Sequence, residues 1–305
     1  MSTLNISGVD HSYELTPPID NSQLPVIVFI HGWLLSRLYW QPIIELLRSD
    51  YQCLLYDLRG FGDSVTTSKL DPEARNGDDA TRFGTGARCQ YSLKAYAQDL
   101  EFLLQNLGIE QAWLIGHSLG GSIALWTADL CPQRVRGVVC VNSGGGIYLK
   151  EEFERFRNVG QQLVKFRPSW LRYVPLMDFI FARMMVARPL TLSWGRQRII
   201  DCIRAEEQAA LGSLLESTTE EEVHLLPQLV SRLQQPVYFI AGSQDRVMEP
   251  KYVHHLASFH KLFAPNGSNV FEIPNCGHLG MLEYPEQVAA IADRAIKKHE
   301  FKINN

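Results

Sequence analysis

Short apolar runs recur along the chain, and segments with helical spacing lie between them. The runs that are typical of buried strands are residues 26–30, 52–56, 112–115, 135–141, 237–242 and 270–273. The segments with helical spacing are residues 40–48, 92–107, 122–128, 251–259 and 285–299. Ser92 and Gly108 are typical start and stop signals of one of these helices. This alternation predicts an α/β fold, with a mainly parallel sheet covered by helices on both faces.

Three stretches depart from this alternation. Residues 3–16 alternate weakly around a glycine and predict an antiparallel hairpin. Residues 65–90 are polar and lack periodicity, so we interpret them as a long surface loop. Residues 147–232 contain no convincing strand and predict a helical insertion, or lid. The predicted organisation is therefore a core of residues 1–146 and 233–305, interrupted by a helical cap at 147–232.

Composition excludes several classes of function. The 305 residues carry a net charge of -4, so the chain has no overall basic field and nucleic acid is not an expected partner. The six cysteines form no C-x-x-C pair, which argues against structural zinc, and Cys53 and Cys140 lie in apolar runs as small core residues would. No signal peptide or membrane-spanning run is visible, and we expect a reduced, cytoplasmic protein. The sequence implies no metal or organic cofactor and does not indicate the oligomeric state.

The strongest motif is Gly116-His117-Ser118-Leu119-Gly120-Gly121, which joins the run at 112–115 to the helix at 122–128. A Gly-x-Ser-x-Gly sequence between a strand and a helix is the arrangement of a nucleophile elbow. The turn is tight, so the positions that flank the serine have to be small. The motif predicts Ser118 as a nucleophile that is exposed above the sheet edge, at the positive end of a helix.

A serine nucleophile needs a base and an acid that orients the base. In open α/β sheets such residues gather where strands end. Asp245 follows the run at 237–242, and His278 follows the run at 270–273. The order Ser118, Asp245, His278 is the order expected for this elbow. His117 is the main competing histidine, but we expect it to point away and to be structural.

Other polar residues near strand ends receive lesser roles. His254, His255 and His260 lie on or beside a helix and are interpreted as surface or packing residues. Asp57 and Asp63 precede the nucleophile and are interpreted as turn residues. Asn142 also ends a strand, but an amide cannot serve as the charged partner of a histidine. For the developing oxyanion, the backbone N–H groups of Leu119 and Trp33 are predicted as donors, because Gly32 lets the backbone before Trp33 turn inward.

Together these motifs resemble the α/β-hydrolase fold superfamily. The resemblance rests on His31-Gly32-Trp33, the segment Asp57-Leu58-Arg59-Gly60-Phe61-Gly62-Asp63-Ser64, the elbow, and the loops that hold Asp245 and His278. It covers nearly the whole chain except 147–232. It implies an eight-stranded sheet, a helical cap and a Ser118–Asp245–His278 triad. Ser118 in place of an aspartate argues against the haloalkane dehalogenase and epoxide hydrolase branches.

The helical insertion is rich in aromatic and basic residues. One interpretation is a lid whose apolar faces pack on the core while its arginines stay in water. The other is a lid with an apolar acyl pocket and a basic rim that approaches anionic membrane surfaces. Between residues 165 and 204 there are eight basic residues and two acidic ones, and the basic set is Lys165, Arg167, Arg172, Arg183, Arg188, Arg196, Arg198 and Arg204.

The sequence therefore predicts a serine hydrolase that cleaves a carboxylic ester with an apolar or lipid-like acyl group, through an acyl-enzyme. The expected partner is a small ester substrate. Two alternatives remain open. One is a carbon–carbon bond hydrolase or lyase acting on a keto acid, which arginines facing the pocket would favour. The other is a member of the fold that binds a ligand without catalysis.

Overall fold

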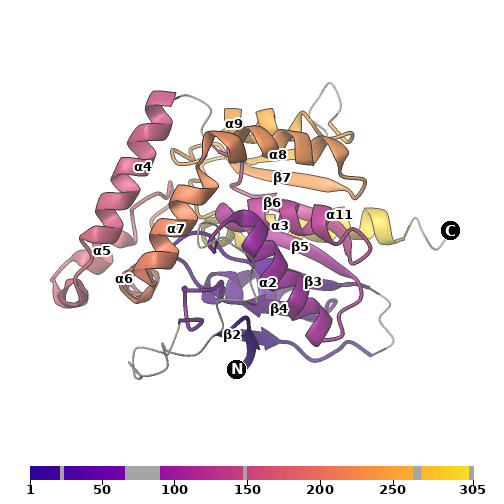
Figure 1. Cartoon of the computed structure of the whole chain (residues 1–305), viewed down its shortest axis with the longest axis horizontal. Helices are drawn as coiled ribbons and strands as arrows, with labels where there is room; N and C mark the ends of the chain where they lie inside the picture. The colour runs from indigo at the N-terminus through magenta and orange to yellow at the C-terminus, as the bar shows by residue number, and fades with distance from the viewer. Residues whose placement is uncertain (21–23, 66–89, 147–149, 264–268, 302–305) are drawn as a thin grey trace, which may run out of the picture.

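One eight-stranded sheet organises the molecule (Figure 1). The computed structural model describes residues 1–20, 24–65, 90–146, 150–263 and 269–301. The sheet has the order β1-β2-β4-β3-β5-β6-β7-β8. Its strands are β1 (Ser2–Ile6), β2 (Val9–Leu15), β3 (Val26–Ile30), β4 (Cys53–Tyr56), β5 (Ala112–His117), β6 (Val135–Val141), β7 (Val237–Gly242) and β8 (Val270–Ile273).

Six of these strands are parallel, as the apolar runs predict. β3 pairs with β4 and β5, and the parallel pairing continues through β6 and β7 to β8. The predicted hairpin forms β1 and β2, which pair antiparallel, and β2 also lies antiparallel to β4. The fold class and the eight strands are thereby confirmed. Cys53 and Cys140 are fully buried in β4 and β6, as expected of small core residues.

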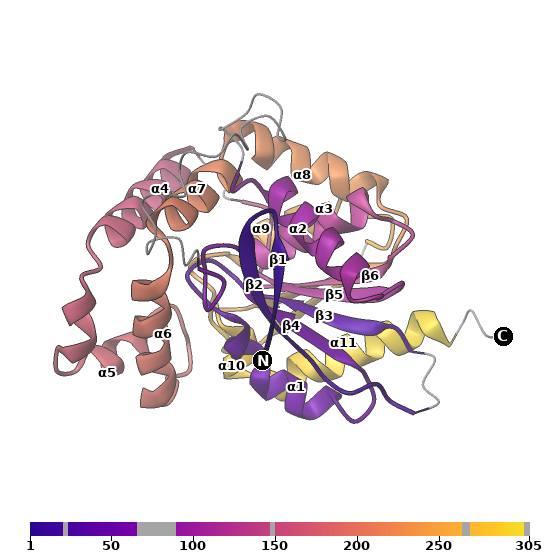
Figure 2. The same ribbon diagram turned by 60° about the horizontal axis from the view of Figure 1, so that its bottom comes forward.

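Helices cover both faces of the sheet (Figure 2). On one face lie α2 (Leu93–Asn106), α3 (Leu119–Leu130), α8 (Glu220–Arg232) and α9 (Pro250–Ala257). On the other lie α1 (Gln41–Leu47), the short α10 (Gly280–Glu283) and α11 (Pro285–Glu300), beside the 3-10 turn η1 (Arg37–Trp40). The predicted caps of α2 are present: Ser92 Oγ accepts a hydrogen bond from the N–H of Ala95, and Gly108 has a φ of 66°.

The remaining helices project from the sheet at one end of the molecule (Figures 1 and 2). They are α4 (Lys150–Lys165), the 3-10 turn η5 (Ser169–Tyr173), α5 (Met177–Phe181), α6 (Leu192–Arg204) and α7 (Glu207–Ser217). We call residues 150–217 the cap. The last helix of the predicted insertion, α8, lies over the sheet beside α3 instead, where Leu226 and Leu229 join the core. The loop predicted at 65–90 lies almost entirely outside the described residues.

The arginines of the cap do not all stay in water. Arg198 is only 5% exposed, and its guanidinium donates hydrogen bonds to the carbonyl oxygens of Phe181 and Met184. Phe181 is the last residue of α5, and Met184 lies just beyond it. The last carbonyls of a helix lack intrahelical donors, so the guanidinium satisfies them. The prediction of solvated arginines is therefore wrong for Arg198.

Polar contacts fasten the cap to the core. Ser36 Oγ donates to Asp201 Oδ2 at 3.1 Å, and Trp33 Nε1 donates to the carbonyl oxygen of Ala210 at 2.8 Å. Arg204 forms an ion pair with Asp63 at 2.9 Å. Burial raises the pKa of Asp201 to about 6, although hydrogen bonds from Gln197 and Ser36 act to lower it.

Asp201 gives the protein a stability that depends on pH. Its pKa is raised in the folded state, so the unfolded chain releases this proton first, and stability falls as pH rises from about 4 to about 6. At neutral pH the buried, ionised carboxylate of Asp201 therefore lowers the free energy of unfolding. Replacing Asp201 by Asn is expected to raise the free energy of unfolding at neutral pH by about 2–3 kcal/mol. Thermal unfolding of both proteins at neutral and mildly acidic pH measures this, and an unchanged or less stable variant at neutral pH would contradict it.

Candidate active site

Ser118 occupies a strained turn between β5 and α3. Its φ of 51° and ψ of -117° lie outside the usual regions for a residue with a side chain. The turn is closed tightly, because a Cβ on Gly116 would lie 2.2 Å from the carbonyl oxygen of Gly120. A Cβ on Gly120 would lie 2.3 Å from the carbonyl oxygen of Ile30. The glycines are therefore required by close backbone contacts, and the start of α3 is pressed against the end of β3.

The structure brings the three predicted triad residues together. Ser118 Oγ lies 3.2 Å from His278 Nε2, within hydrogen-bond distance. On the other side of the ring, His278 Nδ1–H donates to Asp245 Oδ2 at 2.8 Å. Asp245 follows β7 and His278 follows β8, so two strand ends and the elbow deliver these groups to one place. This is the arrangement in which a histidine can remove the serine proton and a carboxylate can hold the histidine.

Further donors surround the carboxylate of Asp245. Burial alone would raise its pKa, but the interaction with His278 and hydrogen bonds from the N–H groups of Met248 and Val247 outweigh burial and lower it. Asn142 Nδ2 also donates to Asp245 Oδ2, at 2.9 Å. The amide that cannot replace the acid thus supports it. In the sequence, the only sign that Asn142 belongs to the site is its position directly after a strand. Its contact with Asp245 could not be predicted, because the two residues are 103 positions apart.

His117 packs against the triad histidine, and the centres of the two rings are 4.9 Å apart. Its ring is buried, and Nε2–H donates to the carbonyl oxygen of His278 at 2.7 Å. Burial, followed by the nearby His278, lowers the pKa of His117 to about 3. His117 therefore stays neutral and positions the backbone of the His278 loop, which agrees with the structural role expected of it.

Glu283 is a buried carboxylate that sequence analysis did not identify. It is 2% exposed, and it accepts hydrogen bonds from the N–H groups of Gly277, Ala187 and Arg188 at 2.8–3.0 Å. One side chain thereby ties the loop that contains His278 to a segment of the cap. A single glutamate in the short apolar stretch at residues 279–285 forms no motif, so no pattern in the chain could have revealed its burial.

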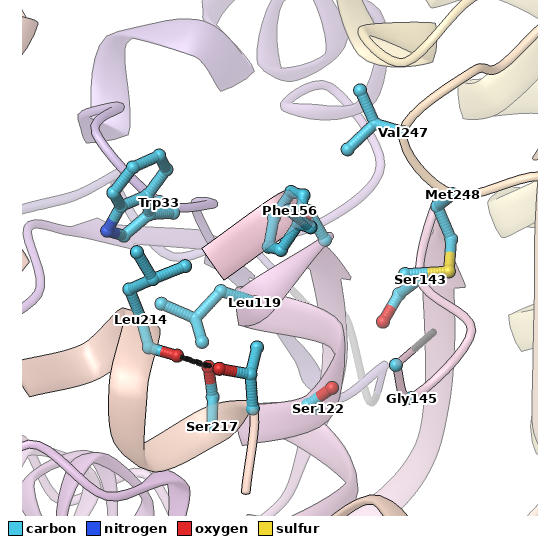
Figure 3. Close-up of a pocket in the computed structure, with 13 residues that line it drawn as sticks. Trp33, Leu119, Ser122, Ser143, Gly145, Phe156, Leu214, Ser217, Val247 and Met248 are labelled. Atoms are coloured by element: carbon cyan, nitrogen blue, oxygen red, sulfur yellow. Dashed lines mark hydrogen bonds between the residues drawn. The ribbon is translucent and has the colours of Figure 1, made fainter. Parts of the chain in front are cut away.

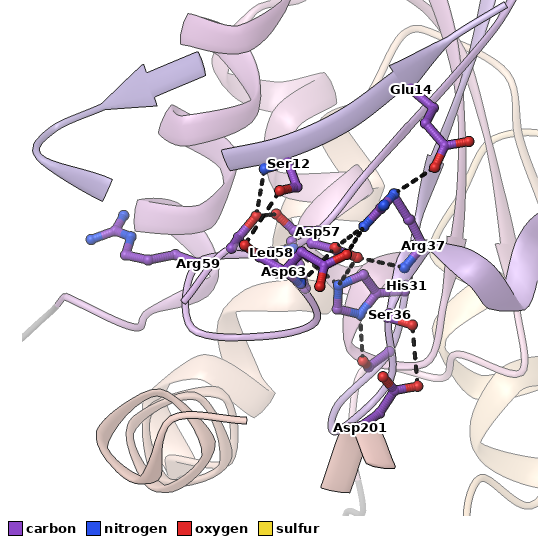
Figure 4. Close-up of polar contacts among 12 residues, drawn as sticks. Ser12, Glu14, His31, Ser36, Arg37, Asp57, Leu58, Arg59, Asp63 and Asp201 are labelled. Carbon is purple, nitrogen blue, oxygen red and sulfur yellow. Dashed lines mark hydrogen bonds and ion pairs between the residues drawn. The ribbon is translucent and has the colours of Figure 1, made fainter. Parts of the chain in front are cut away.

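Buried polar groups also hold the predicted oxyanion loop (Figure 4). His31 Nδ1–H donates to the carbonyl oxygen of Gly32 at 2.8 Å, and Nε2 accepts from the N–H of Leu58 at 3.0 Å. Burial is the main reason that the pKa of His31 is lowered, so the ring stays neutral. Next to it, Arg37 pairs with the fully buried Asp57. Asp57, expected only to shape a turn, is thus part of the core beneath this loop.

Ser118 is one of the residues that line a small pocket, which Figure 3 shows in close-up. Its volume is about 80 Å³. Trp33 and Leu119 line the same pocket as Ser118, and the N–H of Leu119 begins α3, where no intrahelical acceptor is available. The lining side chains are apolar, small or hydroxyl-bearing, with none charged among the described residues: Trp33, Ser118, Leu119, Ser122, Ser143, Gly145, Gly146, Phe156, Leu214, Ser217, Thr218, Val247 and Met248.

Within the described part of the chain, no group of three or more His, Cys, Asp or Glu side chains is placed to hold a metal ion. In the same residues, no helix has the length and apolar character needed to cross a bilayer.

Comparison with known proteins identifies the family of the chain. The family model of the alpha/beta hydrolase fold matches residues 25–285. The chain is 26% identical over 253 residues to the bifunctional esterase/perhydrolase DCH of Acinetobacter calcoaceticus, covering 79% of this chain and 80% of that protein. It is 31% identical over 227 residues to 2-succinyl-6-hydroxy-2,4-cyclohexadiene-1-carboxylate synthase of Yersinia pseudotuberculosis, covering 72% of each.

A solved structure resembles the chain over its whole length. The thermophilic esterase from Thermogutta terrifontis, solved with malate bound, superposes with a TM-score of 0.69 and 22% sequence identity. The alignment covers 98% of this chain and 100% of that protein.

Proposed function

The chain belongs to the alpha/beta hydrolase fold family and is a hydrolase of that fold, and we propose that its substrate is a small neutral carboxylic ester. The observation that carries this proposal is the contact of Ser118 Oγ with His278 Nε2, inside a pocket whose described lining bears no charge. An esterase among the relatives supports it.

The proposed reaction begins when His278 Nε2 takes the proton of Ser118 Oγ, which attacks the ester carbonyl carbon. Asp245 stabilises the resulting imidazolium and fixes its orientation. The N–H groups of Trp33 and Leu119 hold the negative oxygen of the tetrahedral intermediate. His278 then gives its proton to the departing alkoxide, leaving an acyl-enzyme. Water, deprotonated by His278, attacks this acyl group and releases the acid and the free serine.

The absence of a cationic side chain among the described residues of the pocket favours a neutral ester over a keto acid as the substrate. A carboxylate substrate in a closed pocket requires a cation, most often an arginine. Neither arginine nor lysine is among the described residues that line this pocket. Arg198, which is buried in the cap, already donates its hydrogen bonds to cap carbonyls. One relative is named as a synthase of a carboxylate, so the keto-acid reaction is the second function to test.

The volume of the pocket favours a short acyl group. Its volume of about 80 Å³ is small beside the roughly 300–1,000 Å³ of pockets that enclose drug-sized ligands. Among the apolar acyl groups that the sequence suggested, we therefore propose those with short chains. Figure 3 shows the ring of Phe156, from α4 of the cap, over the pocket.

The proposal is tested by turnover of p-nitrophenyl acetate, butyrate, octanoate and palmitate. We expect the highest kcat/KM with acetate or butyrate. Replacing Phe156 by Ala removes the ring over the pocket and is expected to raise the ratio of octanoate to butyrate turnover about tenfold. The matched control is Phe102→Ala, because Phe102 is exposed on α2 and does not line the pocket.

Two results would contradict parts of the proposal. If palmitate is the best substrate of the wild type, the pocket does not define the acyl length. If every ester is inert while the protein is folded, the ester proposal is wrong, and cleavage of keto acids or ligand binding without catalysis becomes the better interpretation.

A further inference from the structure

Exposed hydrophobic side chains are concentrated at the outer end of the cap. Of the fourteen large hydrophobic residues that are exposed in the described part of the chain, nine lie between residues 159 and 192. Those on η5 and around α5 are Trp170, Tyr173, Leu176, Phe179 and Ile180, which are 47–76% exposed. We call these five residues the cap tip. Figures 1 and 2 both show α5 at the end of the molecule furthest from the sheet.

The backbone at the cap tip is strained in a way that exposes an apolar side chain. Leu176, which precedes α5, has a φ of 67° and is 76% exposed. A left-handed conformation is unfavourable for leucine, and most such positions contain glycine or asparagine. A leucine side chain that is exposed to water provides no hydrophobic stabilisation that would offset this backbone strain. Burial of the side chain in an apolar medium would offset the strain.

Basic side chains accompany the aromatic residues of the cap tip. The guanidinium of Arg183 lies 3.4 Å from the ring centre of Phe179, and that of Arg172 lies 4.8 Å from the ring centre of Tyr173. Arg172, Arg183 and the nearby Arg188 are exposed. Aromatic and aliphatic side chains that enter an interface, together with arginines that reach phosphate groups, are typical of surfaces that bind anionic membranes.

Basic residues outnumber acidic residues in this part of the cap. Residues 165–204 have a net charge of +6, whereas the whole chain has a net charge of -4. The two acidic residues in this segment are occupied: Asp201 is buried, and Asp178 pairs with Arg196 at 3.7 Å. The segment that exposes these apolar residues therefore has a net positive charge, to which Arg172, Arg183 and Arg188 contribute at the surface, whereas Arg198 is buried and Arg204 pairs with Asp63 of the core.

We propose that the cap tip docks on an anionic lipid bilayer, with Trp170, Leu176 and Ile180 in the interface and Arg172 and Arg183 at the lipid phosphates. A second copy of the chain is a less favourable occupant, because a symmetric contact between two cap tips would bring two strongly positive segments together. The proposal concerns binding alone and does not depend on the reaction proposed above.

The test is co-sedimentation of the full chain with vesicles. Phosphatidylcholine vesicles that contain phosphatidylglycerol are compared with vesicles of phosphatidylcholine alone. We expect binding to the anionic vesicles to be tighter by about tenfold or more, and to weaken as salt is added. The double variant Leu176→Asp/Ile180→Asp should lose this binding by at least about tenfold, since it places two carboxylates in the interface.

A matched control uses exposed apolar residues elsewhere. Leu46 and Phe102 are 46% and 43% exposed on α1 and α2, so Leu46→Asp/Phe102→Asp adds the same charges away from the cap. It should bind anionic vesicles within about threefold of the wild type. Equal binding to both kinds of vesicle, or unchanged binding by the cap-tip variant, would overturn the proposal. A dimer in light scattering that dissociates in the cap-tip variant would also overturn it, by assigning the surface to self-association.

Discussion

Ester turnover is expected to fall by about 10⁴-fold or more in the variant Ser118→Ala, with KM little changed. The mutation removes Ser118 Oγ, the hydroxyl oxygen that lies 3.2 Å from His278 Nε2. His278 and Asp245 would then have no hydroxyl to activate. The measurement is steady-state turnover of p-nitrophenyl butyrate, corrected for hydrolysis in buffer. A mass increase after treatment with a p-nitrophenyl phosphonate should appear in the wild type and be absent in the variant.

The matched control is Ser122→Ala. Ser122 lines the same pocket from the first turns of α3, so its mutation removes a hydroxyl of the same kind. Turnover by this variant should stay within about tenfold of the wild type. If Ser118→Ala retains activity or the phosphonate label, Ser118 is not the nucleophile, and the triad interpretation fails even if the fold is intact.

Replacing Arg37 by Met is expected to cost about 3–5 kcal/mol of stability, the usual effect of removing one partner from a buried ion pair. Arg37 is 4% exposed and contacts Asp57, Asp63 and Glu14 (Figure 4). Burial would lower the pKa of Arg37, but Asp57 and the other two carboxylates raise it. Arg37 therefore stays protonated and positively charged. Without it, the fully buried carboxylate of Asp57 loses its cation. Thermal or urea-induced unfolding measures the change.

A surface ion pair provides the comparison for this prediction. Arg48 lies 2.8 Å from Glu45, and both side chains are more than half exposed. Arg48→Met should therefore change stability by no more than about 1 kcal/mol. The double variant Arg37→Met/Asp57→Asn should regain part of the loss, since it no longer buries an unpaired charge. An effect of Arg37→Met as small as that of Arg48→Met would show that the buried network adds little.

The sequence alone determined which segments form the mainly parallel sheet and which residues meet at its edge. Apolar runs and helical spacing are local features, so β3 to β8 and the main helices could be predicted from them. The positions of Ser118, Asp245 and His278 followed as well, because parallel strands end at the same edge of a sheet. Residues that follow different strands can therefore be placed together without knowledge of side-chain packing.

Tertiary structure alone decided which polar groups are buried and how large the pocket is. Asn142 and Glu283 support the site through partners that are distant in the chain or unrelated to any motif. Arg198 is buried because it meets carbonyls at the end of another helix, and sequence patterns assigned it to solvent. The volume above Ser118 and the exposure of the cap tip depend on how the cap helices pack. Periodicity shows which face of a helix is apolar, but only packing shows whether another element covers that face.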